Sequence, residues 1–286
     1  METALNWSAI DPMIESALRE DVGAGDFTSD SILAAGVSGE GQVLAKQEGI
    51  VAGLPVFFRV FQILDPNVVC EPRIQDGSPV RAGQVLGTVR GSVRSLLKGE
   101  RTALNFIQRL SGIASLTRAY ATAVEGTGVK ILDTRKTTPN LRFLEKYAVR
   151  AGGGENHRFG LHDMILIKNN HVDAAGGVSP AVSRCLAFLK HEGLDLKIEV
   201  EARSLNEVDE ALRHPVQRIM LDNMSPGEMR EAVRLISGKA ETEASGNIRL
   251  DNVRAVAETG VDFISIGALT HSAPALDISF RIEVME

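Results

Sequence analysis

The sequence has few of the residues that mark extracellular, membrane or nucleic-acid-binding proteins. Its 286 residues include only two cysteines, Cys70 and Cys185, which lie far apart and outside any CxxC pattern. This excludes a disulfide scaffold and predicts a cytoplasmic protein with reduced thiols. No apolar run is long enough to span a membrane, and the start of the chain lacks the pattern of a secretory signal. We therefore expect no membrane partner.

The sequence also lacks an excess of positive charge. It has 31 Lys and Arg against 37 Asp and Glu, a formal net charge of −6. A general nucleic-acid or membrane-surface binder needs a basic excess over a broad face, so we expect no nucleic-acid partner. Any site for an anionic ligand must be local.

Several motifs of common enzyme classes are missing. No GxxxxGK[ST] loop is present, which excludes a P-loop NTPase, and no GxGxxG follows the first strand of the second half. His157, His162 and His171 are close in sequence, but their spacing matches neither HExxH nor a structural zinc pattern. The sequence predicts that His157 binds a ligand carboxylate or orients a neighbour, and that His162 and His171 stabilise the loop.

The N-terminal part has the pattern of a small sheet packed with one helix. Short β-prone segments punctuated by glycine occupy residues 39–91 and flank an apolar helix around PVFFRVFQIL. A long helical stretch follows over residues 93–124, with a break expected at Ser111–Gly112.

After Lys130 the pattern alternates between strands and helices. The expected strands are ILDT, MILIK, LKIEVE, RIMLD, ETEAS and DFISIG, and the last four recur about every twenty residues. A doubly wound sheet would share this rhythm. Polar residues at the ends of nearly all strands, and the missing GxGxxG, favour an α/β barrel, because barrel enzymes carry their chemistry at the carboxyl ends of strands.

The polar residues at these strand ends are the candidate site. They are Asp133, Arg135, Lys136, Lys168, Asn169, Glu199, Glu201, Asp222, Asn223, Ser245, Gly246, Asn247 and Gly267. Any one of them could be a solvated turn residue. Because the strand ends of a barrel converge on one mouth, their recurrence predicts a single site.

One segment of the chain is locally basic. Residues 130–171 hold eight Lys and Arg against four Asp and Glu, a net charge of +4 in a chain of net charge −6. Arginine forks bind carboxylate or phosphate in bidentate fashion and lysine adds a point charge, so this segment predicts a small polyanionic ligand. Arg135, Lys136, Arg158 and Lys168 are the favoured ligands. Arg142, Lys146 and Arg150 have helical spacing and fit a basic helix face.

Acidic residues and glycine-containing turns end the later strands. Glu201 and Asp222 end adjacent strands, where two carboxylates can hold Mg²⁺ or accept hydrogen bonds from sugar hydroxyls. Glu199 lies on the same side of its strand as Glu201, so the pattern alone does not choose between them. The segment EASGNI is expected to open a helix, and it and SIGALTHS suit phosphate binding.

Taken together, these motifs resemble the quinolinate phosphoribosyltransferase (nicotinate-nucleotide pyrophosphorylase, carboxylating) family. The resemblance covers essentially the whole chain and rests on these segments: GERTALNFIQRLSGIAS (99–115), DTRKTTPNLR (133–142), GGGENHRFGLHDMILIKNNH (152–171), EVE (199–201), LDN (221–223), EASGN (243–247) and SIGALTHS (265–272). It implies an N-terminal α/β sandwich domain over residues 1–112, an incomplete α/β (TIM-like) barrel over 113–275, and a C-terminal segment, 276–286, that packs on the first domain.

The resemblance also implies an activity and partners. The family transfers phosphoribose from 5-phosphoribosyl 1-diphosphate to quinolinate with loss of CO2, using Mg²⁺, in NAD biosynthesis. It implies a homodimer with active sites at the subunit interface, where Arg101 reaches into the partner's site.

By the same resemblance, most strand-end residues acquire roles. Arg135, Arg158 and Lys168 correspond to quinolinate ligands, with Lys136 and His157 beside them, and Glu201 corresponds to the metal and ribose acid better than Glu199. The resemblance assigns phosphate contacts to Ser245, Gly246, Asn247 and Gly267. At the position of Asn247 the family often has glycine. The resemblance assigns catalytic roles to Lys136, Lys168, Glu201 and Asp222, and it assigns binding of the metal to Glu201 and Asp222.

Three other interpretations remain open from the residues. A relative that uses nicotinate without decarboxylation would need fewer cations. A Schiff-base lyase could be built on Lys168, since a lysine that ends a barrel strand is a common arrangement. A non-catalytic sensor of small anions would use the same basic cluster.

Overall fold

The computed structural model describes residues 5–34 and 36–285. The chain divides into two compact units. Unit 1 comprises Met1–Arg118, Thr137–Gly153 and Thr270–Glu286, and unit 2 comprises Ala119–Lys136 and Gly154–Leu269. Both units contain helices and strands, which agrees with the α/β class expected from the sequence.

Unit 1 is built on an antiparallel sheet with the order β12-β1-β5-β3. Buried residues of β1 alternate with partly exposed ones, as expected for a sheet with one covered face. Phe57 and Phe61 of the apolar helix α3 are fully buried, and their rings contact Phe280 of β12. The elements of this unit are α1 (Trp7–Val22), α2 (Phe27–Ile32), β1 (Ser38–Ala45), β2 (Gly49–Ile50), α3 (Leu54–Leu64), β3 (Val69–Pro72), β4 (Pro79–Val80), β5 (Val85–Ser92), most of α4 (Val93–Ala123), α5 (Arg142–Ala151) and β12 (Ile278–Val284).

The expected break at Ser111–Gly112 is wrong, because α4 runs without interruption from Val93 to Ala123. Both residues serve close packing. A Cβ on Gly112 would lie 2.0 Å from the carbonyl oxygen of Pro274, so only glycine allows this approach. The hydroxyl of the fully buried Ser111 accepts a hydrogen bond from the backbone N–H of Ala52 at 3.0 Å. Packing against neighbouring backbone therefore outweighs the low helix propensity of the pair.

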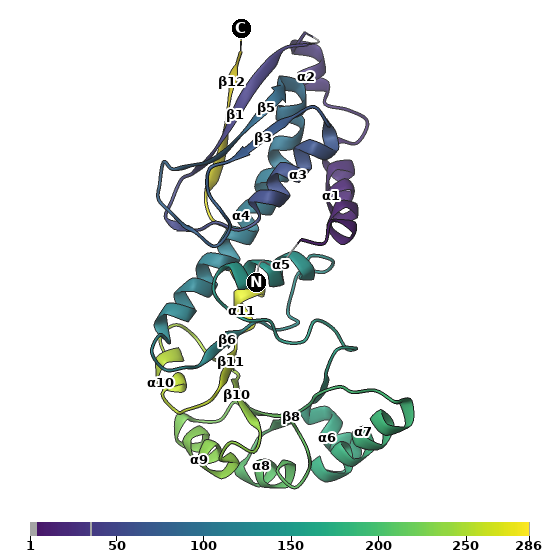
Figure 1. Cartoon of the computed structure of the whole chain (residues 1–286), viewed down its shortest axis with the longest axis vertical. Helices are drawn as coiled ribbons and strands as arrows, with labels where there is room; N and C mark the ends of the chain where they lie inside the picture. The colour runs from purple at the N-terminus through teal and green to yellow at the C-terminus, as the bar shows by residue number, and fades with distance from the viewer. Residues whose placement is uncertain (1–4, 35, 286) are drawn as a thin grey trace. The chain divides into compact units, whose positions relative to one another are not determined.

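Unit 2 contains a parallel sheet of six strands in the order β6-β11-β10-β9-β8-β7. Helices follow the strands and cover one face of the sheet (Figure 1). Its two edge strands, β6 and β7, are not paired with each other, so the sheet is an incomplete barrel, as the sequence predicts. The elements are β6 (Lys130–Leu132), β7 (Ile165–Ile167), α6 (Asn169–Ala175), α7 (Val178–Glu192), β8 (Ile198–Ala202), α8 (Leu205–Ala211), β9 (Arg218–Asp222), α9 (Pro226–Ile236), β10 (Glu241–Ser245), α10 (Val253–Ala257) and β11 (Phe263–Ser265), followed by α11 (Ala268–His271).

The two faces of this parallel sheet differ sharply in polarity. Residues such as Ile198, Val200 and Ala244 are buried and apolar, whereas their neighbours along the same strands are charged. The register pairs Glu199 with Arg218 and Asp222 with Ser245. Because side chains alternate along a strand, the charged residues of β8, β9 and β10 share the concave face. This face has a charged layer at mid-strand and a second polar layer at the carboxyl ends.

The segment between β6 and β7 continues the sheet at its β6 edge. Glu155 forms an isolated parallel bridge with Leu132, and its N–H donates to the Ile131 carbonyl at 2.8 Å. Three residues later, Arg158 Nη1 donates to the Met164 carbonyl at 2.9 Å, next to the start of β7. Residues 155–164 therefore connect the two open edges, and they carry several of the candidate site residues.

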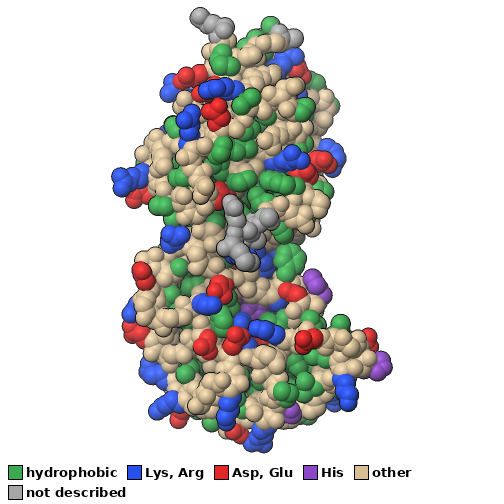
Figure 2. Space-filling model, in the orientation of Figure 1, with side chains coloured by type: hydrophobic (Ala, Val, Ile, Leu, Met, Phe, Trp, Pro, Cys, Tyr) green, Lys and Arg blue, Asp and Glu red, His purple; other side chains and the backbone are tan. Residues whose placement is uncertain are grey.

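No helix among residues 5–34 and 36–285 is long and apolar enough to cross a membrane. Acidic and basic side chains are interspersed over the face shown in Figure 2, with no continuous basic surface on that face.

Candidate active site

Two carboxylates come together at the carboxyl ends of β8 and β9. Glu201 and Asp222 both accept hydrogen bonds from Asn169, the first residue of α6. Its backbone N–H donates to Glu201 Oε2 at 3.0 Å, and its side-chain Nδ2 donates to Asp222 Oδ2 at 3.0 Å. One residue therefore holds the two acids at a common place, as their positions on adjacent strands predict.

Lys168 lies beside this acid pair. Its Nζ is 3.5 Å from Glu201 Oε1, and half of its side chain is exposed. The backbone N–H of Lys168 donates to His171 Nδ1 at 2.9 Å, so His171 stabilises the turn that presents the lysine. This agrees with the loop-stabilising role expected for His171.

Two arginines lie close together near the same acids. Arg158 is 9% exposed, and its Nε is buried without a hydrogen-bond partner among the described residues. Burial and then the charge of neighbouring Arg135 lower the pKa of the Arg158 guanidinium, although Glu199 and Glu201 act in the opposite direction. Two mutually repelling guanidinium groups at a partly dehydrated site are stabilised by an anionic ligand. Lys136 follows on the exposed side of this turn, where its N–H donates to Thr134 Oγ1 at 3.1 Å.

The turn after β10, which the sequence assigns to phosphate, requires a glycine for its backbone. Gly246 has φ +98°, and a Cβ there would lie 2.2 Å from Asn223 Oδ1, so glycine is required. Asn247 has φ +52°, the left-handed region that asparagine tolerates. Its Nδ2 donates to Asn223 Oδ1 at 2.9 Å, so the turns after β9 and β10 are joined.

The helix expected to open at EASGNI is wrong in its position. Residues 246–252 form bends and turns, and α10 begins only at Val253. The side chain of Asn252 instead accepts from Arg249 N at 2.7 Å, and its Nδ2 donates to Asn247 O at 3.1 Å. Any phosphate contact at Ser245–Asn247 therefore comes from the turn itself. Gly267 directly precedes α11, as expected for SIGALTHS.

The residues around the acid pair fit Mg²⁺. Glu201 and Asp222 supply carboxylate oxygens, the ligand type this hard cation prefers. The hydrogen bond from Asn169 Nδ2 to Asp222 turns the amide so that Oδ1 is a buried oxygen with no hydrogen-bond partner among the described residues. Two carboxylates and a buried amide oxygen on the residue that bridges them are a set of oxygen ligands that fits such a cation.

A second charged cluster lies in the layer beneath, and sequence reasoning missed most of it. His157 Nε2 is 2.9 Å from Glu199 Oε2 and 3.5 Å from Glu243 Oε2. These three residues could in principle hold a metal ion. Arg218 Nη1, however, already lies 3.0 Å from Glu243 Oε2, so a cation of the protein neutralises that acid. The signal that could have found Glu243 and Arg218 was alternation along β9 and β10, which places both on the concave face.

Asp133 holds the backbone of the same segment. It is fully buried directly after β6. Its Oδ1 accepts from the N–H of His157 at 2.9 Å, and its Oδ2 accepts from Asn156 Nδ2 at 2.6 Å. Asp133 thus orders residues 156–157 rather than extending toward the mouth.

Not all predicted cations belong to unit 2. Arg101 is exposed on the part of α4 that lies in unit 1. Arg142, Lys146 and Arg150 are on α5 of unit 1, where Arg142 Nε donates to Thr137 Oγ1 at 3.0 Å and Lys146 is buried. Arg150 is exposed, as expected for a basic solvated helix face, whereas the buried Lys146 does not fit that interpretation.

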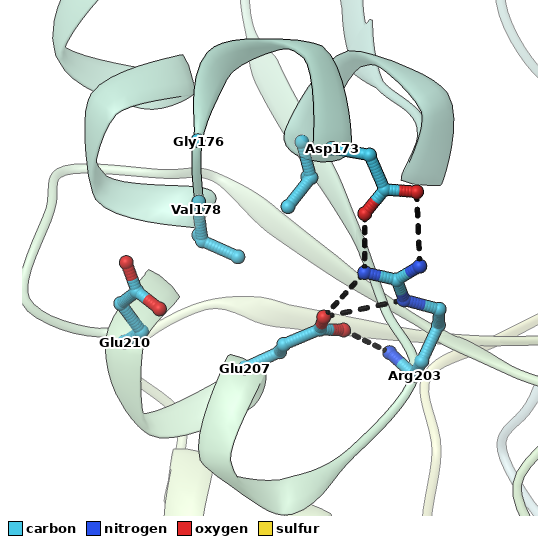
Figure 3. A pocket seen from close by; sticks show the side chains of 8 residues that line it. Asp173, Gly176, Val178, Arg203, Glu207 and Glu210 are labelled. Atoms are coloured by element: carbon cyan, nitrogen blue, oxygen red, sulfur yellow. Dashed lines mark hydrogen bonds and ion pairs between the residues drawn. The ribbon is translucent and has the colours of Figure 1, made fainter.

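A separate hollow of about 340 Å³ lies among α6, α7 and α8 (Figure 3). Its charged groups pair with one another. Arg203 forms a bidentate pair with Asp173, at 2.9 and 3.2 Å, and also contacts Glu207 at 2.8 Å. Glu210 accepts from the N–H of Ser179. We interpret this hollow as a structural junction between helices.

Comparisons with known proteins identify the family of the chain. Residues 26–111 match the model of the quinolinate phosphoribosyl transferase N-terminal domain, and residues 113–281 match that of the C-terminal domain. A Nicotiana tabacum protein named quinolinate phosphoribosyltransferase (decarboxylating) 1b is 46% identical over 95% of this chain and 81% of its own. A Synechocystis protein named probable nicotinate-nucleotide pyrophosphorylase (carboxylating) is 45% identical over 96% of this chain and 93% of its own.

Solved structures are similar over their whole length. NadC from Streptococcus pyogenes has a TM-score of 0.95 and 42% identity, with both chains covered completely. The nicotinate-nucleotide pyrophosphorylase from Francisella tularensis has a TM-score of 0.92 and 37% identity, with 98% of both chains covered. On the strength of both domain models and these full-length likenesses, the chain belongs to the quinolinate phosphoribosyltransferase family.

Proposed function

We propose that this protein transfers the phosphoribosyl group of 5-phosphoribosyl 1-diphosphate to quinolinate and releases diphosphate and CO2, leaving nicotinate mononucleotide for NAD biosynthesis. The observation that carries the proposal is the strand-end edge of unit 2, where the Arg135–Arg158 pair lies near the acid pair Glu201–Asp222. The names of the similar proteins from Nicotiana tabacum and Synechocystis support the same reaction.

Binding of quinolinate is assigned to the cations. Its two adjacent carboxylates require more than one positive group, and Arg135, Arg158 and Lys168 supply them, with Lys136 at the exposed side. Arginine forks hold a planar carboxylate in a defined direction. The cluster therefore both binds the dianion and aims the ring nitrogen at C1 of the ribose. Binding also relieves the repulsion between the two arginines.

Transfer of the phosphoribosyl group develops positive charge on the sugar. As the bond to diphosphate lengthens, C1 gains oxocarbenium character, and the carboxylates of Glu201 and Asp222 stabilise it. Glu201 and Asp222, with Asn169 Oδ1, would hold Mg²⁺, which when bound would neutralise charge on the leaving diphosphate. The turn Ser245–Gly246–Asn247 and Gly267 are assigned to phosphate oxygens through their backbone N–H groups.

Loss of CO2 follows from alkylation of the ring nitrogen. The bond between the ring and the adjacent carboxylate breaks, its electron pair moves toward the positively charged nitrogen, and the ring carbon then takes a proton. Cations that clamped the departing carboxylate would oppose this step. We therefore assign the strongest contacts of Arg135 and Arg158 to the carboxylate that remains.

Diphosphate release tests the proposal directly. Incubation with quinolinate, 5-phosphoribosyl 1-diphosphate and Mg²⁺ is expected to yield diphosphate and CO2 in equal amounts, and chelation of Mg²⁺ is expected to abolish both. Nicotinate in place of quinolinate is the matched control, because it lacks one carboxylate and should turn over far more slowly. Equal turnover of both acids without CO2 would favour the nicotinate-type alternative, and no turnover of either would favour an anion sensor.

The Schiff-base alternative finds less support in the geometry. A nucleophilic lysine needs an environment that favours its neutral amine, such as an apolar pocket or a second cation. Lys168 is half exposed and its Nζ lies 3.5 Å from the carboxylate of Glu201, so it does not lie in an apolar pocket. Borohydride in the presence of a carbonyl substrate should consequently leave no adduct on Lys168.

We also propose that the protein is a cytoplasmic homodimer in which Arg101 completes the partner's site. Residues 113–275 carry the reaction in this proposal, accompanied by residues 1–112 and 276–286. Unit 1 supports an interface: helices α1 and α4 and residues 138–144 border a hollow of about 690 Å³, which includes the apolar side chains of Met13, Phe106 and Leu144. The two cysteines are unpaired, as expected in the cytoplasm.

Mixed dimers test the shared site. Arg101→Ala and Arg135→Ala chains with different tags are co-expressed, and dimers that carry both tags are purified. In a shared arrangement, one of the two sites of such a dimer has both arginines, so about half of the wild-type diphosphate release is expected. Each variant alone should be nearly inactive. Mixed dimers as inactive as the two parents would show that Arg101 does not act across the interface.

A further inference from the structure

The charged layer beneath the proposed site is unusual for a protein interior. Glu199 and Glu243 are both 0% exposed, the His157 side chain is 7% exposed and the Arg218 side chain is 13% exposed. Burying such groups costs free energy unless each is paired, and apolar side chains would often fill the same space at lower cost. Ion pairs offset part of this cost. Arg218 contacts Glu243 and Glu241, each at 3.0 Å, and His157 lies 2.9 Å from Glu199. Apart from these ion pairs, both carboxylate oxygens of Glu199 and Oε1 of Glu243 nevertheless have no hydrogen-bond partner among the described residues.

Both nitrogens of the His157 ring face protein groups. Nε2 is directed at Glu199 and Glu243, at 2.9 and 3.5 Å. The backbone N–H of Arg158 approaches Nδ1 at 2.8 Å. Neither ring nitrogen is therefore in position to bind a ligand without giving up a protein contact. This arrangement suits a side chain that orients its neighbour.

That neighbour is Arg158, the buried arginine assigned to quinolinate. The ring of His157 contacts the Arg158 backbone N–H from one side, while Asp133 accepts the N–H of His157 itself. The Arg158 guanidinium is tied at only one nitrogen, Nη1, to the Met164 carbonyl, and its Nε has no hydrogen-bond partner among the described residues. The position of the Arg158 backbone therefore largely sets the direction of its guanidinium group.

We propose that Glu199 and Glu243 are positioning residues, which hold the His157 ring and, through it, the Arg158 backbone, so that the Arg158 guanidinium meets the quinolinate carboxylate. The inference rests on the proposed function and extends it to residues below the mouth. Glu199 and Glu243 approach the ring from two different strands, β8 and β10. They therefore fix the ring in place as well as in rotation.

The charges around the ring agree with this geometry. Among the groups that face it are Glu199 on β8, Glu243 on β10, and Asp133 and Arg158 at its own backbone, with Arg218 on β9 beyond the two acids. Burial opposes a charged imidazole, but the carboxylates of Glu199 and then Glu243, which accept from the ring, prevail and raise the pKa of His157 to about 9. When Nδ1 is unprotonated it accepts the Arg158 N–H, and the proton of the neutral ring is then on Nε2. Both influences keep a proton on Nε2, between the ring and the carboxylates.

The experiment compares Glu199→Gln and Glu243→Gln with Glu241→Gln. The control also removes a carboxylate from Arg218, but Glu241 has a 40% exposed side chain and its carboxylate is paired with Arg218. Glu199→Gln and Glu243→Gln each remove a charged hydrogen bond at the His157 ring, and each is expected to raise KM for quinolinate about tenfold. KM for 5-phosphoribosyl 1-diphosphate should stay within about twofold of the wild-type value. Glu241→Gln should change neither constant.

Two further measurements separate positioning from a general loss of structure. In a His157→Asn background, Glu199→Gln should add little to the quinolinate KM, because both changes break the same connection. NMR of histidine-labelled wild-type protein without ligands should show a His157 Nε2–H signal protected from exchange. This signal should disappear in the Glu199→Gln/Glu243→Gln protein, with the pKa of His157 falling toward its ordinary value, and should persist in Glu241→Gln.

The outcomes distinguish this inference from the proposed function. Additive effects in the His157→Asn background, equal rises in both KM values, or an unprotected Nε2–H in the wild type would each overturn the positioning role. The wild-type spectrum decides the case even if the variants do not fold. A wild type that shows the protected signal but does not turn over quinolinate would refute the reaction while leaving the buried network in place.

Discussion

Replacing Arg158 with glutamine is expected to raise KM for quinolinate by about a hundredfold, because two charge-assisted hydrogen bonds to one carboxylate are lost. The effect should be large because burial and Arg135 already disfavour the Arg158 charge, which an anionic ligand stabilises. KM for 5-phosphoribosyl 1-diphosphate should change much less. Steady-state diphosphate release with each substrate varied in turn measures both constants.

Arg142→Ala is the matched control for this substitution. Arg142 belongs to the same basic segment of the sequence but lies on α5 of unit 1, where it donates to Thr137. We expect its quinolinate KM to remain within about twofold of wild type. Equal effects of Arg158→Gln and Arg142→Ala, with melting temperatures unchanged, would show that the quinolinate pocket has been misplaced.

Asp222→Asn is expected to lower kcat by about a hundredfold to a thousandfold, the usual cost of removing one preorganised electrostatic group. The amide keeps the shape of the carboxylate and can still accept the hydrogen bond from Asn169. The fall in kcat therefore measures the effect of removing the negative charge. More Mg²⁺ should also be needed for half-maximal activity, because one of two carboxylate ligands is gone. Titration of Mg²⁺ under saturating substrates separates the two effects.

An exposed aspartate provides the control for this charge removal. Asp209 on α8 forms an i,i+4 ion pair with Arg213 at 2.6 Å and has a 52% exposed side chain. Asp209→Asn should leave kcat and the Mg²⁺ requirement unchanged. If Asp222→Asn were as active as Asp209→Asn, the acid pair would have no part in stabilising the sugar, and the metal would belong elsewhere.

The positions of strands and their polar ends could be predicted from the sequence with few errors. The six segments from ILDT to DFISIG all form strands of one parallel sheet, because buried β-branched runs bounded by polar turns are strong local signals. The two errors concern glycine. Gly112 does not break α4 and Gly246 does not directly precede a helix, since close approach to Pro274 and to Asn223 explains these glycines better than helix punctuation does.

Contacts between side chains that are far apart in the chain could not be predicted from the sequence. Glu199 and Glu201 are on the same side of β8, and their local patterns are alike. Their different places follow from strand register, which sets Glu199 opposite Arg218 and Glu201 opposite Met220. In the same way, Asn169 looked like one strand-end residue among many, yet its backbone and side chain bridge the two acids.

By itself the sequence determined the α/β class, the repeated strand–helix order, the family resemblance and the concentration of charge at strand ends, because all of these depend on residues near one another in the chain. Only the tertiary structure decided which charges meet. His157, Glu199, Arg218 and Glu243 are far apart in sequence, and the curvature of the parallel sheet brings them into one buried layer beneath Glu201 and Asp222. The alternation of residues along one strand indicates which face of the sheet a side chain occupies. The distance between side chains on different strands is set by strand order and register.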